Sequence, residues 1–283
     1  MKHEIIDIWE GIEQFTDNDN KDEIRPALAT YILEGTSELN ADKKRASVLI
    51  CPGGGYAYTS DREAEPVAMR FLAAGFNAFI LRYRTAPSRH PKPLLDLSRA
   101  MWIIRENADK WNLDPEKIAV CGFSAGGHLA ASLGVFWNEL YISEAIGMPE
   151  GINKPNGLIL GYPVITSGKY AHRGSFSNLL GRDATAEQKE GMSLELHVKN
   201  QVPPTFLWHT FHDLAVPVEN SLLFAQALRQ SGIPFELHIF PDGPHGLSLC
   251  DEETAVNNPD LINPHAANWM PLCIEWLKEL FSS

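Results

Sequence analysis

Residues 117–127 read KIAVCGFSAGG and combine an apolar run, a serine between glycines and the start of a helix. The run from Ile118 to Cys121 is typical of a strand that is buried on both faces. The G-x-S-x-G pattern follows at once, and an amphipathic helix is expected over 125–137. This order predicts a nucleophile elbow, a sharp turn that exposes the Ser124 hydroxyl at the helix N-terminus. A chance match in a glycine-containing turn is the alternative, and the flanking strand and helix argue against it.

Apolar runs alternate with helical patterns along the rest of the chain. We expect strands at 47–51, 78–81, 117–121, 157–161, 205–208 and 236–239, and helices at 65–74, 93–111, 220–230 and 266–281. Such alternation predicts an α/β fold with a mostly parallel central sheet flanked by helices. A strand-like stretch at 29–33 and a charged turn at 41–45 indicate an edge hairpin. Residues 166–201 are expected to form a lid-like insertion within one domain, residues 1–283.

Composition restricts the class of protein and its partners. The 283 residues carry 24 Lys and Arg against 36 Asp and Glu, a formal net charge of −12, and 44% are hydrophobic. These values exclude disorder as the main state and disfavour nucleic acid and anionic membranes as partners. The acidic start MKHEIID does not resemble a secretory signal, and no window approaches the roughly 18 apolar residues of a membrane span.

Cysteine usage indicates the compartment. The chain has four cysteines, Cys51, Cys121, Cys250 and Cys273. They have no paired spacing, and three of them lie in apolar sequence. They are typical of reduced core thiols rather than disulfides. We therefore expect a soluble, cytoplasmic protein.

A serine nucleophile needs a histidine base and a carboxylate that orients the histidine. His245 lies in a Gly/Pro-rich loop after a predicted strand, and Asp213 follows the strand at 205–208. The chain order is therefore Ser, Asp, His, as in α/β-hydrolases. Asp242 is a rival acid, but the loop between it and His245 is short and makes Asp213 the preferred choice.

Acyl transfer also needs backbone N–H donors for the negative charge that develops on the carbonyl oxygen. Residues 52–56, PGGGY, end an early strand and offer such donors without side chains in the way. Gly54, Gly55 and Ala125 are the predicted oxyanion donors. Phosphate binding by this loop is disfavoured because neither G-x-G-x-x-G nor G-K-[ST] is present.

With these three motifs in order, the chain resembles the α/β-hydrolase superfamily from about Leu49 to its C-terminus. Within it, the PGGGY loop and REAEP at 62–66 resemble bacterial acetyl esterases and acetylxylan-esterase-like sugar hydrolases. The resemblance implies hydrolysis of short-chain carboxylic esters without a metal ion or a cofactor. In this reaction Ser124 is acylated, His245 acts as base and then acid, and Asp213 holds the imidazole. One departure is Pro52, where the related loop usually carries histidine.

The substrate is expected to be a small ester, with acetylated oligosaccharides as a natural choice. Three aromatic residues lie just past strand ends, where they could stack on a sugar or bound an acyl slot. These predicted pocket residues, for which core packing is the alternative, are Tyr56, Tyr83 and Tyr162. The edge hairpin could also mediate a homodimer.

Three other functions are compatible with parts of the sequence. His209, His212, Asp213 and His245 could form a metal site, but strand-end spacing would point the first two histidines to opposite faces. A peptidase related to prolyl oligopeptidase shares the fold and the order of the triad, but such enzymes usually carry a large gating module. A non-catalytic ligand-binding hydrolase fold would be expected to lack a triad member, and none is missing here.

Overall fold

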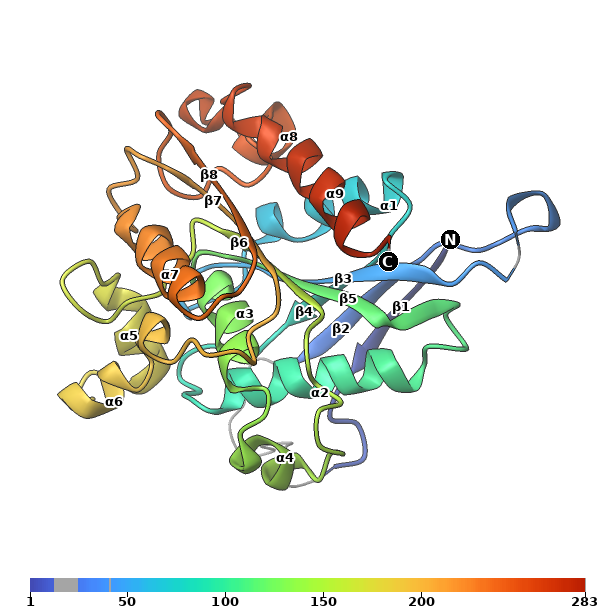
Figure 1. Ribbon diagram of the computed structural model, residues 1–283, viewed down its shortest axis with the longest axis horizontal. Coiled ribbons are helices and arrows are strands. Elements are labelled where there is room, and N and C mark those ends of the chain that lie inside the picture. Colours follow the sequence, from blue (N-terminus) through green and yellow to red (C-terminus); the bar gives the residue numbers. More distant parts are fainter. Residues whose placement is uncertain (13–24, 41, 283) are drawn as a thin grey trace.

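An eight-stranded sheet forms the centre of the protein, whose computed structural model describes residues 1–12, 25–40 and 42–282 (Figure 1). The strands are β1 (Lys2–Asp7), β2 (Ala27–Ile32), β3 (Arg45–Cys51), β4 (Asn77–Arg82), β5 (Leu113–Phe123), β6 (Gly157–Gly161), β7 (Thr205–Thr210) and β8 (Phe235–Phe240). Their order is β1-β2-β4-β3-β5-β6-β7-β8. Strands β4, β3, β5, β6, β7 and β8 are parallel, whereas β1–β2 and β2–β4 pair antiparallel. The prediction of a mostly parallel sheet is confirmed.

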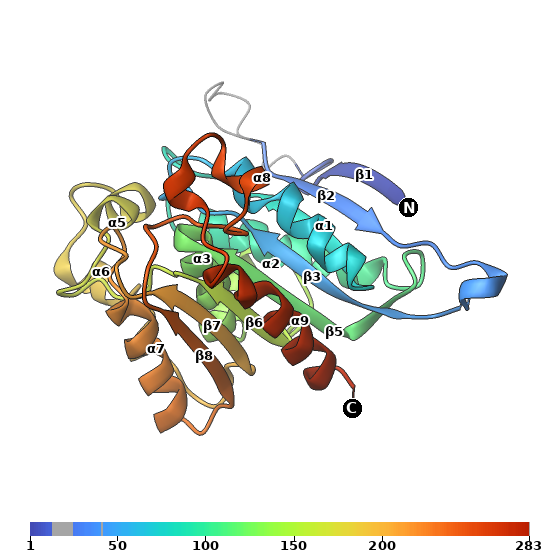
Figure 2. The ribbon, with the colours of Figure 1, turned by 90° about the horizontal axis from the view of Figure 1, so that it is seen from above.

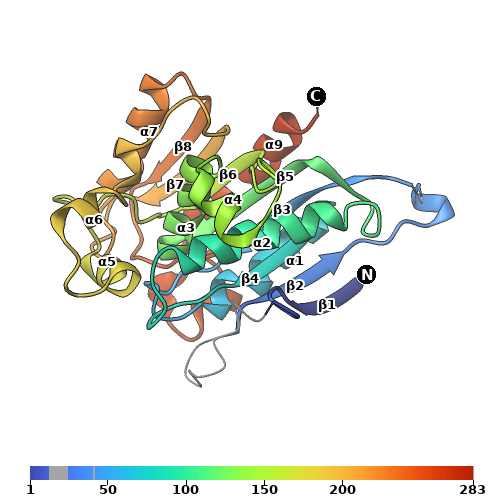
Figure 3. The same ribbon diagram turned by 90° about the horizontal axis from the view of Figure 1, so that it is seen from below.

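Helices cover both sides of this sheet. On one side, seen in Figure 2, lie α1 (Glu65–Ala73), α8 (Glu252–Ala255) and α9 (Trp269–Leu280). On the other, seen in Figure 3, lie α2 (Lys92–Glu106), α3 (Ser124–Phe136), α4 (Leu140–Ile146) and α7 (Glu219–Gln230). Single 3-10 turns are η2 (Ser37–Leu39), η3 (Asp61–Glu63), η4 (Leu194–Leu196), η5 (Pro259–Leu261) and η6 (Ala266–Asn268).

Side chains of the central strands alternate between two buried layers. Leu49 and Val120 belong to the core packed by α2 and α3, and their neighbours Ile50 and Cys121 belong to the core packed by α1 and α9. Successive strand residues point to opposite faces, so a continuous apolar run supplies both layers. All four cysteines are buried and free. No helix within the described ranges is long and apolar enough to cross a membrane.

The edge of the sheet differs from the prediction. The antiparallel pair at the edge is formed by β1 and β2, and the charged turn leads instead into β3 in the interior of the sheet. Sequence patterning missed β1 because most of its side chains are exposed and it has no apolar run. Residue 41 of the predicted turn lies outside the described residues. A homodimer through this edge stays a prediction.

Two helices also differ from the prediction. Helix α2 ends at Glu106 rather than near residue 111, and the short helix α4 was not expected. The segment 166–201, called the insertion below, leaves the sheet between β6 and β7 and carries α5 (Arg173–Leu180), α6 (Ala186–Glu190) and η4. Figure 1 shows α5 and α6 beside α7, at one end of the molecule.

Candidate active site

The loops that follow the parallel strands bring the predicted functional residues together at the carboxyl ends of the strands. Gly54 follows β3, Ser124 follows β5, Asp213 follows β7 and His245 follows β8. Parallel strands end at the same edge, so residues far apart in sequence meet there. The loops after β3 and β8 are called the oxyanion loop (residues 52–60) and the histidine loop (residues 241–250).

Ser124 occupies the sharp turn between β5 and α3. Its φ of +52° is in the left-handed region, which an L-residue adopts only at a cost. The turn also requires glycine at two positions. A Cβ on Gly122 would lie 2.1 Å from the Gly126 carbonyl oxygen, and a Cβ on Gly126 would lie 2.1 Å from that of Cys51. The G-x-S-x-G pattern therefore allows strand β3, strand β5 and helix α3 to approach closely enough to hold the serine in place.

Ser124, His245 and Asp213 form a chain of hydrogen bonds. The Nδ1 atom of His245 lies 2.6 Å from Oδ2 of Asp213, and its Nε2 atom lies 2.8 Å from Oγ of Ser124. Because an ionised carboxylate only accepts, the ring proton is on Nδ1 and Nε2 accepts the serine hydroxyl. The Ser124 side chain is oriented to lose its proton to His245.

The Asp213 carboxylate has a full set of donors. Its Oδ1 accepts the backbone N–H groups of Ala215 (3.0 Å) and Val216 (2.9 Å). Its Oδ2 lies 3.3 Å from Nε2 of His209, as well as receiving His245. Burial raises the pKa of this carboxyl, but the hydrogen bonds from His209 and His245 outweigh burial and hold the pKa well below its ordinary value. Asp213 is therefore ionised throughout the neutral range.

His209 now has an explanation that its sequence context did not supply. Its Nδ1 lies 2.8 Å from the Ser221 hydroxyl, and its Nε2 lies 2.9 Å from the Val216 carbonyl oxygen. With a carbonyl and the Asp213 carboxylate both facing Nε2, that nitrogen carries the proton and donates. The fully buried His209 thus helps to hold the Asp213 carboxylate in place.

The rival acid Asp242 pairs with a histidine other than His245, and the residues considered for a metal site are not grouped as ligands. Asp242 pairs with His212, whose Nδ1 lies 2.9 Å from Oδ1, and both side chains are mostly exposed. The carboxylate of Asp242 is thus directed to His212, and that of Asp213 to His245. Within the described ranges, no three His, Cys, Asp or Glu side chains are grouped so as to hold a metal ion.

The predicted oxyanion donors lie beside the serine. Gly54 and Gly55 have φ values of +130° and +63°, and a Cβ on Gly54 would lie 2.2 Å from the Tyr58 carbonyl oxygen. Both glycines line the same cavity as Ser124. In the part of the chain that the structure describes, neither N–H group donates a hydrogen bond, and that of Ala125 lies in the first turn of α3, where helical partners are lacking. The three amides are available to a substrate oxygen.

Several side chains fix the oxyanion loop around Pro52. The Gly53 N–H donates to Oε2 of Glu63 at 2.7 Å, and the Tyr83 hydroxyl donates to the Pro52 carbonyl oxygen at 2.6 Å. From the insertion, Asn178 Nδ2 donates to the Gly55 carbonyl oxygen at 2.8 Å. The loop that contains Pro52 is therefore held by three hydrogen bonds to residues outside it.

Glu63 also connects the oxyanion loop to the histidine loop. Its Oε1 accepts the Tyr162 hydroxyl at 2.6 Å, and that hydroxyl oxygen accepts the Ser248 N–H at 2.9 Å. The neighbouring Arg62 donates to the Gly246 carbonyl oxygen at 2.6 Å. Both residues lie in the REAEP segment. Sequence reasoning noted this segment but assigned no role to it.

Replacing Glu63 by alanine is expected to lower kcat about 10- to 100-fold, because two donors lose their acceptor and the oxyanion loop is released. The kcat of Glu63→Gln should lie between those of the wild type and Glu63→Ala, since one amide oxygen cannot accept from both donors. Ester hydrolysis by purified variants, with kcat and KM determined separately, is the measurement. Glu65→Ala is the matched control: this nearby carboxylate accepts the Tyr31 hydroxyl, outside the site. Equal kcat values for Glu63→Ala and Glu65→Ala would contradict the positioning role.

The prediction that three tyrosines line the substrate pocket needs correction. All are fully buried: the Tyr83 hydroxyl is bonded to Pro52, that of Tyr162 to Glu63, and that of Tyr56 lies 2.9 Å from Nδ1 of His128. None lines the cavity at Ser124. A buried phenol hydroxyl needs a hydrogen-bond partner, and the partners of these three hydroxyls lie in the protein interior. The Tyr162 ring instead packs edge-on against the His245 ring, with 5.0 Å between centroids.

The cavity at Ser124 is about 380 Å³ in volume, and its surface is polar and apolar in about equal parts. Its lining residues come from the oxyanion loop, the REAEP segment, α3, the insertion and the histidine loop: Gly54, Gly55, Tyr58, Ser60, Arg62, Glu63, Ser124, His172, His245 and Gly246. Tyr58 is the exposed aromatic side chain of this set. Tyr58 and His172 were not predicted.

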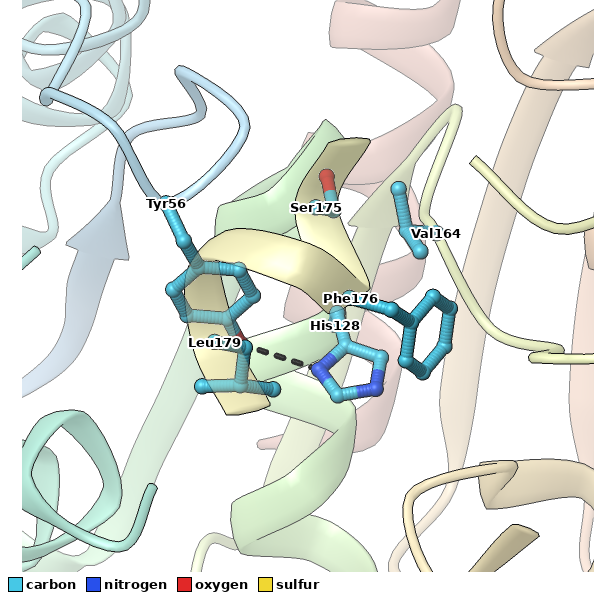
Figure 4. A pocket seen from close by; sticks show the side chains of 6 residues that line it. All are labelled: Tyr56, His128, Val164, Ser175, Phe176 and Leu179. Atoms are coloured by element: carbon cyan, nitrogen blue, oxygen red, sulfur yellow. Dashed lines mark hydrogen bonds between the residues drawn. The ribbon is translucent and has the colours of Figure 1, made fainter. Parts of the chain in front are cut away.

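A second, smaller pocket lies between α3, α5 and Tyr56 (Figure 4). Its polar centre is His128, which is fully buried on α3; Nδ1 faces the Tyr56 hydroxyl and Nε2 lies 3.0 Å from the Met192 carbonyl oxygen. A carbonyl only accepts, so Nε2 carries the proton and Nδ1 accepts from Tyr56. Burial lowers the pKa of His128 from 6.5 to about 4, which keeps the ring neutral.

This shift predicts a pH dependence of stability. Protons bind His128 more readily in the unfolded chain, so its contribution is fully present above pH 6.5 and is lost as the pH falls towards 4. The loss amounts to about 3 kcal/mol of the free energy of unfolding at most. Urea unfolding at a series of pH values measures it. In His128→Gln, which keeps one donor and one acceptor, stability should fall less steeply over this range; a slope equal to that of the wild type would refute the assignment.

Several known proteins are similar to this chain. A family model described as BD-FAE matches residues 37–228, which include Ser124 and Asp213 and end before His245. Endo-1,4-beta-xylanase B of Butyrivibrio fibrisolvens is 45% identical over 221 residues, covering 76% of this chain and 34% of the relative. Acetylxylan esterase of Xylanibacter ruminicola is 30% identical over 204 residues, covering 70% and 40%. The chain thus spans well under half the length of these two curated relatives.

A solved structure is similar over nearly its whole length. The acetyl ester-xyloside bifunctional hydrolase from Caldicellulosiruptor lactoaceticus has 38% sequence identity and a TM-score of 0.82. The similarity covers 98% of this chain and 96% of that one.

Proposed function

This chain belongs to the BD-FAE family and has the α/β-hydrolase fold, and we propose that it is a serine carboxylesterase that removes acetyl groups from sugars or oligosaccharides. The observation that carries the proposal is the hydrogen-bonded chain of Ser124, His245 and Asp213. Its serine and histidine line the same cavity as Gly54 and Gly55, whose amides donate no hydrogen bond within the described residues. A nucleophile, its base, the acid that orients the base and oxyanion donors are what acyl transfer requires.

The proposed reaction proceeds through an acyl-enzyme. Ser124 Oγ attacks the ester carbonyl carbon while Nε2 of His245 takes the hydroxyl proton. The carbonyl oxygen, now negatively charged, accepts hydrogen bonds from the amides of Gly54, Gly55 and Ala125. His245 then protonates the leaving alcohol, and the acyl group stays on the serine. A water molecule, deprotonated by the same nitrogen, releases the acid and regenerates the enzyme.

Three features support a small acyl group on a sugar. The cavity of about 380 Å³ is near the small end of the range for ligand pockets, which favours a short acyl chain. The polar side chains in its lining, such as Arg62 and Glu63, suit an alcohol rich in hydroxyl groups, and the exposed ring of Tyr58 offers a surface for a sugar face. The names of two relatives refer to acetylxylan and to acetyl ester and xyloside hydrolysis.

Hydrolysis of p-nitrophenyl acetate, butyrate and octanoate tests this function. We expect kcat/KM to decrease in that order and to be unaffected by EDTA, since no step uses a metal ion. A preference for octanoate would contradict the short acyl pocket. Loss of activity on adding EDTA would favour metal-dependent hydrolysis instead.

A further inference from the structure

The insertion contributes His172 to the wall of the cavity at Ser124. The ring is half-buried, and its Cε1 atom lies 3.9 Å from where a Cβ on Gly55 would be. It is not the catalytic base, because Ser124 Oγ is bonded to His245. A second histidine beside the oxyanion loop is therefore left without a role in the proposed chemistry.

The end of helix α5 fixes the protonation of this ring. His172 is the N-cap of α5, and its Nδ1 accepts the backbone N–H of Ser175 at 3.3 Å. The Ser175 hydroxyl lies 2.8 Å from the same nitrogen. A backbone N–H can only donate, so Nδ1 presents its lone pair and the proton of the neutral ring is on Nε2. Burial and the nearby His245 ring lower the pKa of His172, which favours this neutral form.

The N–H group at Nε2 has no partner in the residues that the structure describes. It is thus a fixed donor on a ring that lines the cavity at Ser124. An acetyl ester has few oxygens to offer. Its carbonyl oxygen is met by the oxyanion amides, its bridging oxygen receives a proton from His245, and its methyl group cannot accept a hydrogen bond. Any further acceptor belongs to the alcohol part.

We propose that the Nε2–H group of His172 donates a hydrogen bond to an oxygen of the alcohol part of the substrate and so selects alcohols rich in oxygen, such as a sugar. This assignment rests on the proposed esterase function. It makes the insertion a determinant of specificity, carried by one residue whose tautomer is set by the helix that it caps. The bond is neutral and partly exposed to solvent, so its loss should cost about tenfold in kcat/KM.

Two esters of the same ring size isolate this contact: a methyl pyranoside with one acetyl group, and cyclohexyl acetate, which has no oxygen beyond the ester. The measured quantity is the ratio of their kcat/KM values. His172→Asn is the main variant, because asparagine still caps α5 through its carbonyl oxygen but has no donor at the position of Nε2. His197→Asn, on the same insertion but outside the cavity lining, is the matched control.

The wild type and His197→Asn should prefer the pyranoside ester, and His172→Asn should lower that ratio about tenfold with cyclohexyl acetate hydrolysed as before. An unchanged ratio, an equal loss on both esters, or a wild type without preference would overturn the role of His172 alone. A wild type that hydrolyses neither ester would overturn the proposed function, and the inference with it.

Discussion

Ser124→Ala is expected to lower kcat for p-nitrophenyl acetate by about 10⁴-fold or more, because no acyl-enzyme can form. The remaining rate would come from water that attacks while the oxyanion amides and His245 are intact. The fold should be unaffected, since the left-handed turn at this position is formed by backbone contacts of Gly122 and Gly126 that alanine does not disturb.

The measurement is steady-state hydrolysis together with labelling by a fluorophosphonate, which reacts covalently with activated serines. The wild type should gain the mass of one label, and Ser124→Ala should gain none. Ser132→Ala is the matched control, because this buried serine on the same helix donates only to the His128 carbonyl oxygen. Turnover or labelling that persists in Ser124→Ala would remove the nucleophile from the proposal.

The sequence predicts best what depends on neighbouring residues and on general rules of parallel sheets. The strand, elbow and helix at 117–137 are adjacent in the chain, so their pattern is local. Asp213 and His245 could be selected because strand ends share one edge, even though 32 positions separate them. Helix ends were less predictable: Trp111 continues an apolar pattern, but the chain leaves helix α2 at Glu106.

Contacts between distant segments set the rest of the site. Glu63 meets Tyr162 across 99 positions, and Asn178 meets Gly55 across 123, so no local pattern reveals either. For Tyr56, Tyr83 and Tyr162, the sequence instead predicted a role in the pocket that the structure does not give them. Each follows a strand end as expected, but the direction of a side chain depends on the turn, and Tyr56 and Tyr162 have φ values of +58° and +36° that direct their hydroxyls to buried partners.

Asp213→Asn is expected to lower kcat about 10³- to 10⁴-fold by reversing the tautomer of His245. The backbone N–H groups of Ala215 and Val216 both donate to Oδ1, so the asparagine oxygen has to stay at that position. Its NH₂ group then replaces Oδ2 and faces Nδ1 of His245. Two donors cannot face each other, so the His245 proton moves to Nε2, where it blocks transfer from Ser124.

The matched variant for this prediction is Asp242→Asn, which removes the rival carboxylate. Its partner His212 is exposed, and the pair is not connected to His245 by any hydrogen bond of the described residues, so kcat should change less than about twofold. Both variants retain a side chain of the same size, so a difference between them reports the charge and the hydrogen-bond direction rather than packing. The decisive measurement is kcat for p-nitrophenyl acetate at neutral pH. A large loss in Asp242→Asn with activity retained in Asp213→Asn would reverse the assignment of the acid, because only the carboxylate that holds His245 can impose its tautomer.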